Sequence, residues 1–240
     1  MSDLEEMIKQ AVIMVAGDAT RMRPLTDNMP KCMIELNCKP LLAYTIDILR
    51  NNGINNLVLI VGYKKKVIQD YFKTNYTDMK VQFVEQRQRL GTGHAVKQAE
   101  PYIKGEFMVA NGDVLFENSL IKNLLSDHKT GEITITAEEV PDARPYGALI
   151  IKDDMITDII EKSPNPPTNL INAGFYIFPK GTFRAIKQTK KSPRGEYELT
   201  DSVRFMINFG VITRPSYYNG ARIELTSPAD VPIAEKYLKK

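Results

Sequence analysis

The amino-acid sequence predicts an α/β protein in which helices cover both faces of a mixed, mostly parallel sheet. In the first half of the chain, short apolar runs alternate with amphipathic segments, which is the pattern of βαβ units. In the second half, apolar runs follow one another across turns rich in proline and aspartate, so this part of the sheet is expected to be mixed. With 240 residues, 43% of them hydrophobic, the chain has the size and the apolar content of one large domain.

The first half is predicted to contain four strands, each a run of apolar residues, and three helices with apolar residues at helical spacing. The strands are residues 11–16, 56–61, 80–85 and 107–110, and the helices are residues 39–52, 64–73 and 93–102. Because each helix connects two strands, the strands are expected to run parallel. Sheets of this kind bind ligands at the carboxyl ends of their strands.

The second half is predicted to contain strands at residues 132–140, 147–152, 155–161, 173–178 and 211–217, and helices at residues 181–188, 198–209 and 228–239. Ser227 precedes the last helix and is expected to be its N-cap, because a serine hydroxyl accepts a hydrogen bond from the first turn. The sequence shows no internal repeat and no low-complexity linker. We therefore expect residues 1–240 to form a single domain.

Charge and composition argue against several classes of protein. The formal net charge is +3, from 32 basic and 29 acidic residues, which is too small to indicate a nucleic acid or a membrane surface as partner. No apolar run approaches the ~18 residues of a membrane-spanning helix, and the first residues do not resemble a signal peptide, so a cytoplasmic location is expected. Cys32 and Cys38 are expected to be free thiols. With His94 and His128 far away in the sequence, no zinc site is predicted.

The loop after the first strand is the strongest candidate for a binding site. Small residues from Ala16 to Thr20 let backbone N–H groups approach an anion, and Arg21, Arg23 and Lys31 follow. This pattern suits a phosphate group. Two known phosphate motifs, Walker A and the dinucleotide fingerprint G-x-G-x-x-G, do not occur here. A surface loop with solvated arginines is the competing interpretation of this segment taken alone.

Asp113 directly follows a predicted strand, in the sequence Asn111-Gly112-Asp113, so its carboxylate is expected at the carboxyl end of the sheet. Mg²⁺ prefers one or two carboxylates together with phosphate oxygens and water, which makes Asp113 a candidate ligand near a phosphate-binding loop. The alternative is an ordinary turn, because this composition is common in turns that bind no ligand.

A second junction between a strand and a helix contains two glycines, in the sequence Leu90-Gly91-Thr92-Gly93-His94. The backbone amides of this loop and the side-chain amide of Gln86 are suited to hydrogen bonds with the edge of a nucleobase. The alternative is an ordinary helix start with Thr92 as the N-cap. The sequence places no carboxylate or nucleophile to pair with His94, and we expect this residue to be structural.

Three short motifs lie at the edges of strands in the second half. They are Tyr146-Gly147, Glu161-Lys162 and Asn172-Ala173-Gly174. Together they offer a close approach of the backbone at Gly147, a carboxylate and an amide for sugar hydroxyls, and an ammonium group for a phosphate. This set suits a phosphorylated sugar, although each motif alone is also typical of solvated surface.

Taken in order, these motifs resemble those of the sugar-phosphate nucleotidylyltransferases. The resemblance begins at about residue 11, continues to the end of the chain, and rests on Ala16-Gly17-x-Ala19-Thr20-Arg21-Met22-Arg23-Pro24-Leu25-Thr26, Pro30-Lys31, Leu90-Gly91-Thr92-Gly93-His94-Ala95, Gly112-Asp113, Tyr146-Gly147, Glu161-Lys162, Asn172-Ala173-Gly174 and Gly195-Glu196-x-x-Leu199-Thr200-Asp201. The likeness is greatest to the glucose-1-phosphate thymidylyl- and uridylyltransferases. The chain also resembles the pyrophosphorylase domain of N-acetylglucosamine-1-phosphate uridylyltransferase, especially its archaeal forms.

The resemblance implies a Rossmann-like three-layer αβα nucleotidyltransferase fold. It also implies a reaction in which UTP or dTTP and a sugar 1-phosphate, of the glucose or N-acetylglucosamine type, give a nucleotide sugar and pyrophosphate. The residues that it makes catalytic are Arg21, Lys31, Asp113 and Lys162. Those that it assigns to the nucleotide are Ala16, Gly17, Ala19, Thr20, Gln86, Gly91 and Thr92. Those that it assigns to the sugar phosphate are Gly147, Glu161, Lys162 and Asn172, and Asp113 would bind Mg²⁺.

Such a reaction needs no covalent nucleophile. A phosphate oxygen of the sugar 1-phosphate attacks the α-phosphorus in line with the leaving pyrophosphate, and Arg21, Lys31 and Lys162 with Mg²⁺ bring the two polyanions together. Glu161 and Asn172 favour a sugar over a choline phosphate, because a choline cation calls for an aromatic cage. Homo-oligomers are usual in the family and are expected here by analogy.

Two residues depart from the family's pattern. Ala19 stands where the family usually has glycine, and its Cβ restricts any conformation with positive φ that the loop needs. Near the carboxyl end the family commonly has Trp-x-Asp-Val-Gly-Thr-Pro, and alignment on Ser227-Pro228 places Glu224 at the metal-binding aspartate. Glu224 is therefore the second expected ligand of Mg²⁺.

These departures leave an alternative open, a non-catalytic relative that binds a nucleotide or a nucleotide sugar and regulates an active partner. Retention of Arg21, Lys31, Asp113 and Lys162 argues for the enzyme, because a protein that only binds has less need of every cation around the reacting phosphates. The sequence ends at residue 240, so we do not expect the left-handed β-helix domain of many relatives, nor acetyl transfer.

Overall fold

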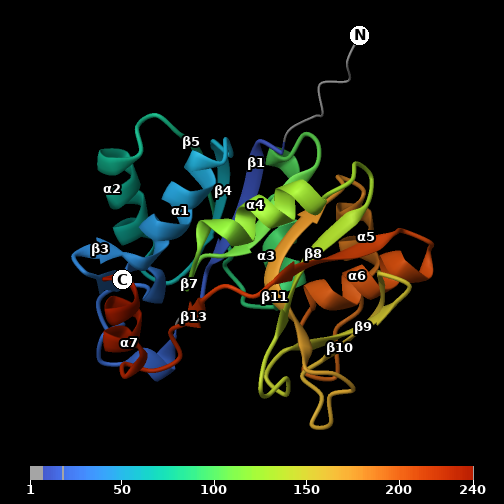
Figure 1. Cartoon of the computed structure of the whole chain (residues 1–240). Coiled ribbons are helices and arrows are strands. Elements are labelled where there is room, and N and C mark those ends of the chain that lie inside the picture. The colour runs from blue at the N-terminus through green and yellow to red at the C-terminus, as the bar shows by residue number, and fades with distance from the viewer. Residues whose placement is uncertain (1–7, 18, 240) are drawn as a thin grey trace.

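The centre of the fold is a set of four parallel strands (Figure 1). β1 (Gln10–Val15) lies between β4 (Asn56–Val61) and β6 (Phe107–Asn111) and runs parallel to both, and β5 (Lys80–Glu85) pairs with β4. Because these strands are parallel, their carboxyl ends meet at one edge of the sheet, as the sequence predicts. The structure, a computed structural model, describes residues 8–17 and 19–239.

The rest of the nine-stranded sheet is mixed. β11 (Leu170–Phe178) runs antiparallel to β6 and joins the parallel part to the strands of the second half. Those strands are β8 (Ile133–Glu139), β9 (Gly147–Lys152), β10 (Met155–Glu161) and β12 (Thr213–Tyr218). β8 pairs antiparallel with β11 and parallel with β12, whereas β9 and β10 form an antiparallel hairpin.

Helices cover both faces of the sheet. One face carries α1 (Leu41–Asn51), α2 (Lys65–Asn75) and α4 (Asn118–Asp127), and the other carries α3 (Thr92–Lys97), α5 (Thr182–Gln188) and α6 (Leu199–Asn208). β1 shows the reason, since Ala11 and Ile13 are buried against the first group of helices and Val12 against the second. The expected α/β fold, with a mixed central sheet between two helical layers, is therefore confirmed.

A third apolar cluster joins the end of the chain to the loop after β1. It includes Met22 from this loop and Ala234 from α7 (Asp230–Tyr237). In the same region β13 (Arg222–Glu224) pairs antiparallel with β7 (Val114–Phe116). The carboxyl-terminal segment therefore lies beside the edge at which the parallel strands end.

A small hairpin lies between the loop after β1 and α1. β2 (Glu35–Leu36) pairs antiparallel with β3 (Lys39–Pro40), so α1 begins at Leu41 and not at residue 39 as predicted. At the tip of the hairpin, Asn37 Nδ2 donates a hydrogen bond of 3.0 Å to Glu235 O in α7. The hairpin thus links the first helix to the last.

The segment after β5 differs from the prediction of one helix over residues 93–102. α3 ends at Lys97, and a separate 3₁₀ helix covers Glu100–Tyr102. Pro101 explains the break, because it has no N–H to donate to the preceding turn. The sequence analysis did not predict α4, which follows β7. No helix among the described residues is long and apolar enough to cross a lipid bilayer.

The start of the last helix also differs from the prediction. α7 begins at Asp230, and Ser227 is not its N-cap. Instead, Asp230 Oδ2 accepts hydrogen bonds of 2.7 Å from the backbone N–H groups of Thr226 and Ser227. The Asp230 carboxylate therefore holds the turn before the helix, because hydrogen bonds to a charged acceptor are stronger than those to a neutral hydroxyl.

Phe107→Ala is expected to destabilise the fold. Phe107 is fully buried and its ring stacks on that of Phe183, with centroids 5.0 Å apart, so the substitution leaves a cavity between β6 and α5. We expect the free energy of unfolding, measured by urea denaturation, to fall by about 3–5 kcal/mol. The control is Phe209→Ala, because the Phe209 side chain is 74% exposed. This control should lose less than about 1 kcal/mol, and equal losses in both variants would contradict the assigned core.

Candidate active site

Several of the residues predicted to bind the substrates leave the sheet at one edge. The loop after β1 carries Arg21 and Lys31, the turn after β6 carries Asp113, and Gln86 follows β5. β1, β4, β5 and β6 are parallel, so these segments all leave the sheet at the same edge. This is the edge at which open α/β sheets bind ligands.

An ion pair joins two of these segments. Lys31 Nζ lies 2.7 Å from Asp113 Oδ2, and the two side chains are 11% and 36% exposed, so solvent screens the pair only in part. Gly112 lets the turn after β6 pack against β1, because a Cβ at Gly112 would lie 2.4 Å from Val15 Cγ1. The predicted cation and the predicted metal ligand are therefore in direct contact.

The antiparallel pairing of β13 with β7 brings the backbone of Glu224 to the start of β7, directly after Asp113. Glu224 is opposite Val114 in the strand register, and Val114 directly follows Asp113. The sequence alignment on Ser227-Pro228 assigned Glu224 to the same site as Asp113. The strand register places the two residues at neighbouring positions on paired strands.

The two carboxylates suit a hard divalent cation. Among the described residues, no group of three or more His, Cys, Asp or Glu side chains could hold a metal ion. Asp113 and Glu224 are a smaller set than such a group, so a cation held by two carboxylates would have to complete its coordination with oxygen atoms of substrate and water. Mg²⁺ binds in this way at sites that act on phosphates, whereas a zinc site needs more protein ligands.

Ala19 adopts a left-handed conformation in the loop after β1, with φ of 45° and ψ of 50°. Its carbonyl oxygen accepts hydrogen bonds from Met22 N, at 2.9 Å, and from Thr26 Oγ1, at 3.1 Å. These bonds hold a conformation that costs an L-residue with a Cβ about 1–2 kcal/mol. The positive φ for which the family uses glycine is therefore formed here with alanine.

The 3₁₀ helix Thr20–Met22 turns its polar side chains outward. Met22 is 1% exposed and anchors the loop in the third apolar cluster, whereas Thr20 and Arg21 are exposed. Gly17 is also exposed, while Ala16 is buried at the end of β1. The buried Met22 side chain thus anchors the loop, while its exposed residues are accessible to a ligand.

Two glycines in the loop before α3 permit a close contact between backbones. A Cβ at Gly91 would lie 2.6 Å from Tyr197 O, and a Cβ at Gly93 would lie 2.9 Å from the same atom. Gly93 N donates a hydrogen bond of 2.8 Å to Tyr197 O, and Tyr197 N donates one of 2.7 Å to Leu90 O. The sequence analysis assigned the amides of this loop to a nucleobase, but the N–H of Gly93 is used within the protein.

The Gln86 side chain contacts this loop and the His94 ring. Gln86 is 7% exposed, and its Nε2 donates to Gly91 O at 3.2 Å and lies 3.0 Å from His94 Nδ1. Burial, together with the nearby Lys97, lowers the pKa of His94 below its ordinary value, so the imidazole is neutral and Nδ1 can accept this bond. The amide nitrogen of Gln86 therefore orders the loop, a role that the sequence analysis did not predict.

Thr92 is the first residue of α3, and Gly91 is the N-cap. The interpretation in which Thr92 caps its own helix is therefore wrong. Thr92 Oγ1 instead accepts a hydrogen bond of 3.0 Å from Leu199 N at the start of α6. Thr92 thus ties α6 to α3 at the edge of the site.

Glu161 and Lys162 lie at the end of β10, beside α6. Glu161 Oε2 accepts a hydrogen bond of 3.0 Å from Thr200 Oγ1, and Glu161 Oε1 lies 4.0 Å from Lys162 Nζ. Burial raises the pKa of Glu161 above its ordinary value, against the opposite effects of Thr200 and Lys162. Gly147, opposite Glu161 on β9, leaves room for this carboxylate, since a Cβ there would lie 3.0 Å from Glu161 Oε2.

Asn172 lies within β11, which begins at Leu170 and not at residue 173 as predicted. Its Nδ2 donates to Tyr176 Oη at 2.5 Å, and its Oδ1 accepts from Gly174 N at 3.0 Å. The cause is an irregularity in β11 between Asn172 and Tyr176, where Gly174 has a φ of 86°. Asn172 is therefore a buried residue with both ends of its amide engaged, and not the turn residue that the motif suggested.

The sequence analysis missed a buried arginine beside the site. The Arg222 side chain is 6% exposed, forms an ion pair with Glu138 on β8, and has Nη1 3.9 Å from Glu224 Oε2. Its guanidinium carbon lies 5.4 Å from the centroid of the Tyr146 ring. Arg222 thus connects the strand that carries Glu224 to the residue before Gly147. The sequence could have pointed to Arg222, because an arginine stands at the position where the family commonly has tryptophan.

The cysteine next to Lys31 offers no reactive thiolate to the site. Both Cys32 and Cys38 are free, as predicted. Cys32 follows Lys31 and is 2% exposed, and burial, with a further contribution from Asp113, raises the pKa of its thiol. The Cys32 thiol is therefore protonated at neutral pH.

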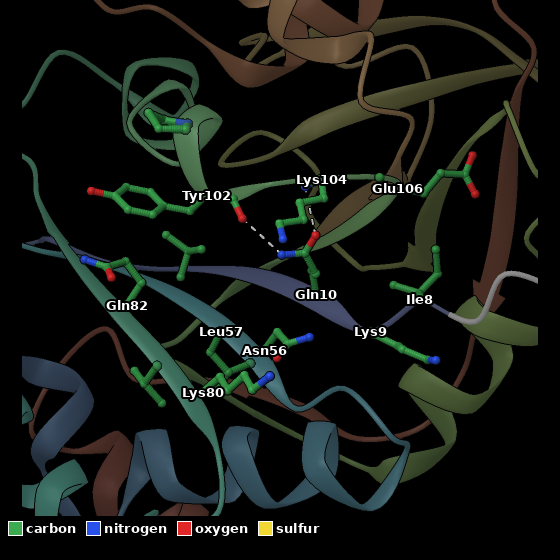
Figure 2. Close-up of a pocket in the computed structure, with 14 residues that line it drawn as sticks. Ile8, Lys9, Gln10, Asn56, Leu57, Lys80, Gln82, Tyr102, Lys104 and Glu106 are labelled. Atoms are coloured by element: carbon green, nitrogen blue, oxygen red, sulfur yellow. Dashed lines mark hydrogen bonds between the residues drawn. The ribbon is translucent and has the colours of Figure 1, made fainter.

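A cavity of about 1080 Å³ lies at the opposite edge of the sheet. The first residues of β1, β4 and β5 line it, and Figure 2 shows Gln10 at its centre. Gln10 Nε2 donates to Tyr102 O at 3.1 Å, and Gln10 Oε1 accepts from Lys104 N at 2.9 Å. None of the predicted site residues lines this cavity, so the length of the parallel strands separates it from the candidate site.

Comparison with known proteins identifies the family of this chain and several similar proteins. The sequence profile of the family described as nucleotidyl transferase matches residues 10–212. The bifunctional protein GlmU of Methanocaldococcus jannaschii is 39% identical over 229 residues, which are 95% of this chain and 54% of that protein. The UTP–glucose-1-phosphate uridylyltransferase AglF of Haloferax volcanii is 34% identical over 235 residues, which are 96% of this chain and 97% of that protein.

The chain thus spans about half the length of the first relative and nearly the whole length of the second. A crystal structure of a UDP-glucose pyrophosphorylase complexed with UDP-glucose matches with a TM-score of 0.88 and 26% sequence identity, over 98% of this chain and 100% of that chain. On the extent of the family match and the identity to these relatives, the chain belongs to the nucleotidyl transferase family.

Proposed function

We propose that this protein transfers a nucleotidyl group from UTP or dTTP to a sugar 1-phosphate of the glucose or N-acetylglucosamine type, with release of pyrophosphate. The observation that carries the proposal is the ion pair of Lys31 with Asp113 at the carboxyl edge of the parallel strands, with Glu224 opposite Val114 on the paired strand. Membership of the nucleotidyl transferase family supports it. So does the likeness to AglF, a UTP–glucose-1-phosphate uridylyltransferase, over nearly the whole of both chains.

The proposed reaction joins two polyanions, so its barrier is mainly one of charge and position. A phosphate oxygen of the sugar 1-phosphate attacks the α-phosphorus, and the bond to the pyrophosphate oxygen breaks as the new bond forms. Arg21 and Lys31 hold the triphosphate, and Lys162 holds the sugar phosphate. No proton needs to move, because the attacking phosphate is already ionised at neutral pH.

The nucleotide end of the site consists, in this proposal, of the loop after β1 and the loop before α3. Apart from Gly17 and its two chain neighbours, no described atom lies within 4 Å of the position of a Cβ at Gly17, so the backbone there is open to a phosphate. The Gln86 side chain fixes the loop that faces the base. The proposed contacts are Ala16, Gly17, Ala19 and Thr20 for the triphosphate, and Gln86, Gly91 and Thr92 for the base.

The sugar end consists of Gly147, Glu161, Lys162 and Asn172. The Glu161 carboxylate accepts one hydrogen bond from Thr200 and has acceptor capacity left for sugar hydroxyls. Gly147 keeps the space next to that carboxylate open. The Asn172 amide binds a sugar hydroxyl in exchange for its present bond to Tyr176 Oη.

We assign Mg²⁺ to Asp113 and Glu224. When bound, the ion neutralises charge on the reacting phosphates. Lys31 lies 2.7 Å from Asp113, so its ammonium group acts on the same phosphates as the ion. Arg222 positions Glu224 from the other side, through the contact of 3.9 Å between Nη1 and Oε2.

The alternative, a non-catalytic relative that binds a nucleotide, has less support. It was motivated by Ala19 and Glu224, yet Ala19 adopts the positive φ, and Glu224 supplies a carboxylate on the strand that pairs with the residue after Asp113. Neither departure therefore removes the loop conformation or the second carboxylate that the reaction is proposed to use. A single domain over residues 1–240, a cytoplasmic location and a homo-oligomeric state stay predictions.

Pyrophosphate release tests the proposed reaction. We expect release from UTP or dTTP with glucose 1-phosphate or N-acetylglucosamine 1-phosphate in the presence of Mg²⁺, and none when the sugar 1-phosphate is left out. An excess of chelator should stop the release, since the charge of the phosphates is then not neutralised. Binding of nucleotides without pyrophosphate release, over a panel of nucleotides and sugar 1-phosphates, would favour the regulatory relative.

Asp113→Asn and Lys31→Ala should each lower kcat by about 10²–10³, because the first removes the charge of a proposed metal ligand and the second removes a positive charge next to the reacting phosphates. The circular dichroism spectrum should stay that of the wild type, since neither side chain lies in the core. Lys152→Ala is the matched control, because it removes an exposed ammonium group at the end of β9. Wild-type kcat in Lys31→Ala would show that its assigned role is wrong.

Ala19→Gly should raise the free energy of unfolding by about 0.5–1 kcal/mol, because glycine adopts a positive φ without the steric penalty of a Cβ. Urea denaturation measures the change. The control is Ala185→Gly within α5, which should instead lose about 1 kcal/mol or more of the free energy of unfolding. A loss in both variants would mean that the loop after β1 holds no backbone strain at Ala19.

A further inference from the structure

A second cavity, of about 460 Å³, lies between α3, α5 and the segment that precedes α6. Its lining includes four lysines and no carboxylate, and these are Lys97, Lys187, Lys190 and Lys191. Lys187 Nζ lies 2.6 Å from Glu100 Oε1, so one of the four charges is paired. Among the ion pairs between described residues, none involves the other three lysines. The cavity therefore has an excess of positive charge.

The other walls of this cavity suit the organic part of a ligand. Tyr197 and His94 both line it, with ring centroids 6.5 Å apart and ring planes at 29°. Leu90 and Ile186 add apolar surface. Lys191 Nζ lies 5.6 Å from the centroid of the Tyr197 ring, so cation and aromatic surface occur side by side. A cavity of several hundred Å³ has the size of a typical site for a small ligand.

We propose that this cavity is a second ligand site, for a small phosphorylated molecule. Its phosphate lies against Lys97, Lys190 and Lys191, because charge-assisted hydrogen bonds from ammonium groups are strong where no carboxylate competes. Its organic part packs against Tyr197. No residue assigned above to the nucleotide, the sugar phosphate or the metal ion lines the cavity, so the site is separate from the one in the proposed reaction.

The second site nevertheless shares a wall with the proposed nucleotide site. Tyr197 N donates to Leu90 O at 2.7 Å, and His94 Nδ1 lies 3.0 Å from Gln86 Nε2. An occupant of the cavity would thus contact residues that order the loop around Gly91. A role in regulating nucleotide binding rests on the proposed function, whereas the binding itself does not.

Histidine NMR spectra test the proposal directly, because the chain contains only two histidines. The probe is inorganic phosphate. Its addition should shift the ring signals of His94 in a saturable way, and His94→Gln identifies those signals by their loss. His128 is the internal control, since its ring contacts Glu106 and Thr134 and does not line the cavity. Its signals should not move.

The double variant Lys190→Ala/Lys191→Ala should weaken the binding of phosphate by about tenfold or more, as read from the His94 signals. The matched control Lys152→Ala/Lys180→Ala removes the same charge from exposed positions outside the cavity and should leave the dissociation constant unchanged. Lys31→Ala should leave it unchanged as well, because Lys31 belongs to the other site.

The proposal is overturned if wild-type His94 shows no saturable shift. It is also overturned if the shift persists in Lys190→Ala/Lys191→Ala, or if it is lost in Lys31→Ala, since the phosphate would then be bound at the proposed catalytic site. The readout needs no turnover. Failure of this proposal is therefore distinguishable from failure of the proposed reaction, which pyrophosphate release decides.

Discussion

The parallel pairing of β1 with β6 is the constraint on which the candidate site depends. Met14 is opposite Asn111 in this register, so the loop after β1 and the turn after β6 begin side by side at one edge of the sheet. The ion pair between Lys31 and Asp113 requires this arrangement, because its two partners leave the sheet from neighbouring strands. The same pairing requires glycine at position 112, because a Cβ there would collide with side chains of β1.

The two ends of the proposed site depend on contacts between segments far apart in the sequence. At the nucleotide end, Gly91 and Gly93 accept the backbone of Tyr197 at a distance that no other residue type would allow. At the end proposed for the metal ion, β13 pairs with β7, and Glu224 is opposite the residue that follows Asp113. In both places a short backbone contact brings together segments that lie far apart in the sequence.

Much of the fold could be predicted from the sequence, whereas the partners of the polar side chains could not. β4, β5, β9 and β10 have the predicted bounds, because turn residues flank each apolar run. The order of the motifs located the candidate site. The amides of Gln86 and Asn172 were assigned to ligands, yet each has internal partners that depend on a distant ring or on a distortion of its own strand. Arg222 was missed because its burial depends on Glu138, which lies on another strand.

The central claim is that the site joins two phosphates directly, without a nucleophile of the protein. The stereochemical course at the α-phosphorus tests this claim most directly, with a nucleotide that carries a single sulfur of known configuration on that phosphorus. One in-line displacement predicts inversion of configuration in the nucleotide sugar. Retention would mean two displacements through a nucleotide bound covalently to the protein, and it would contradict the account.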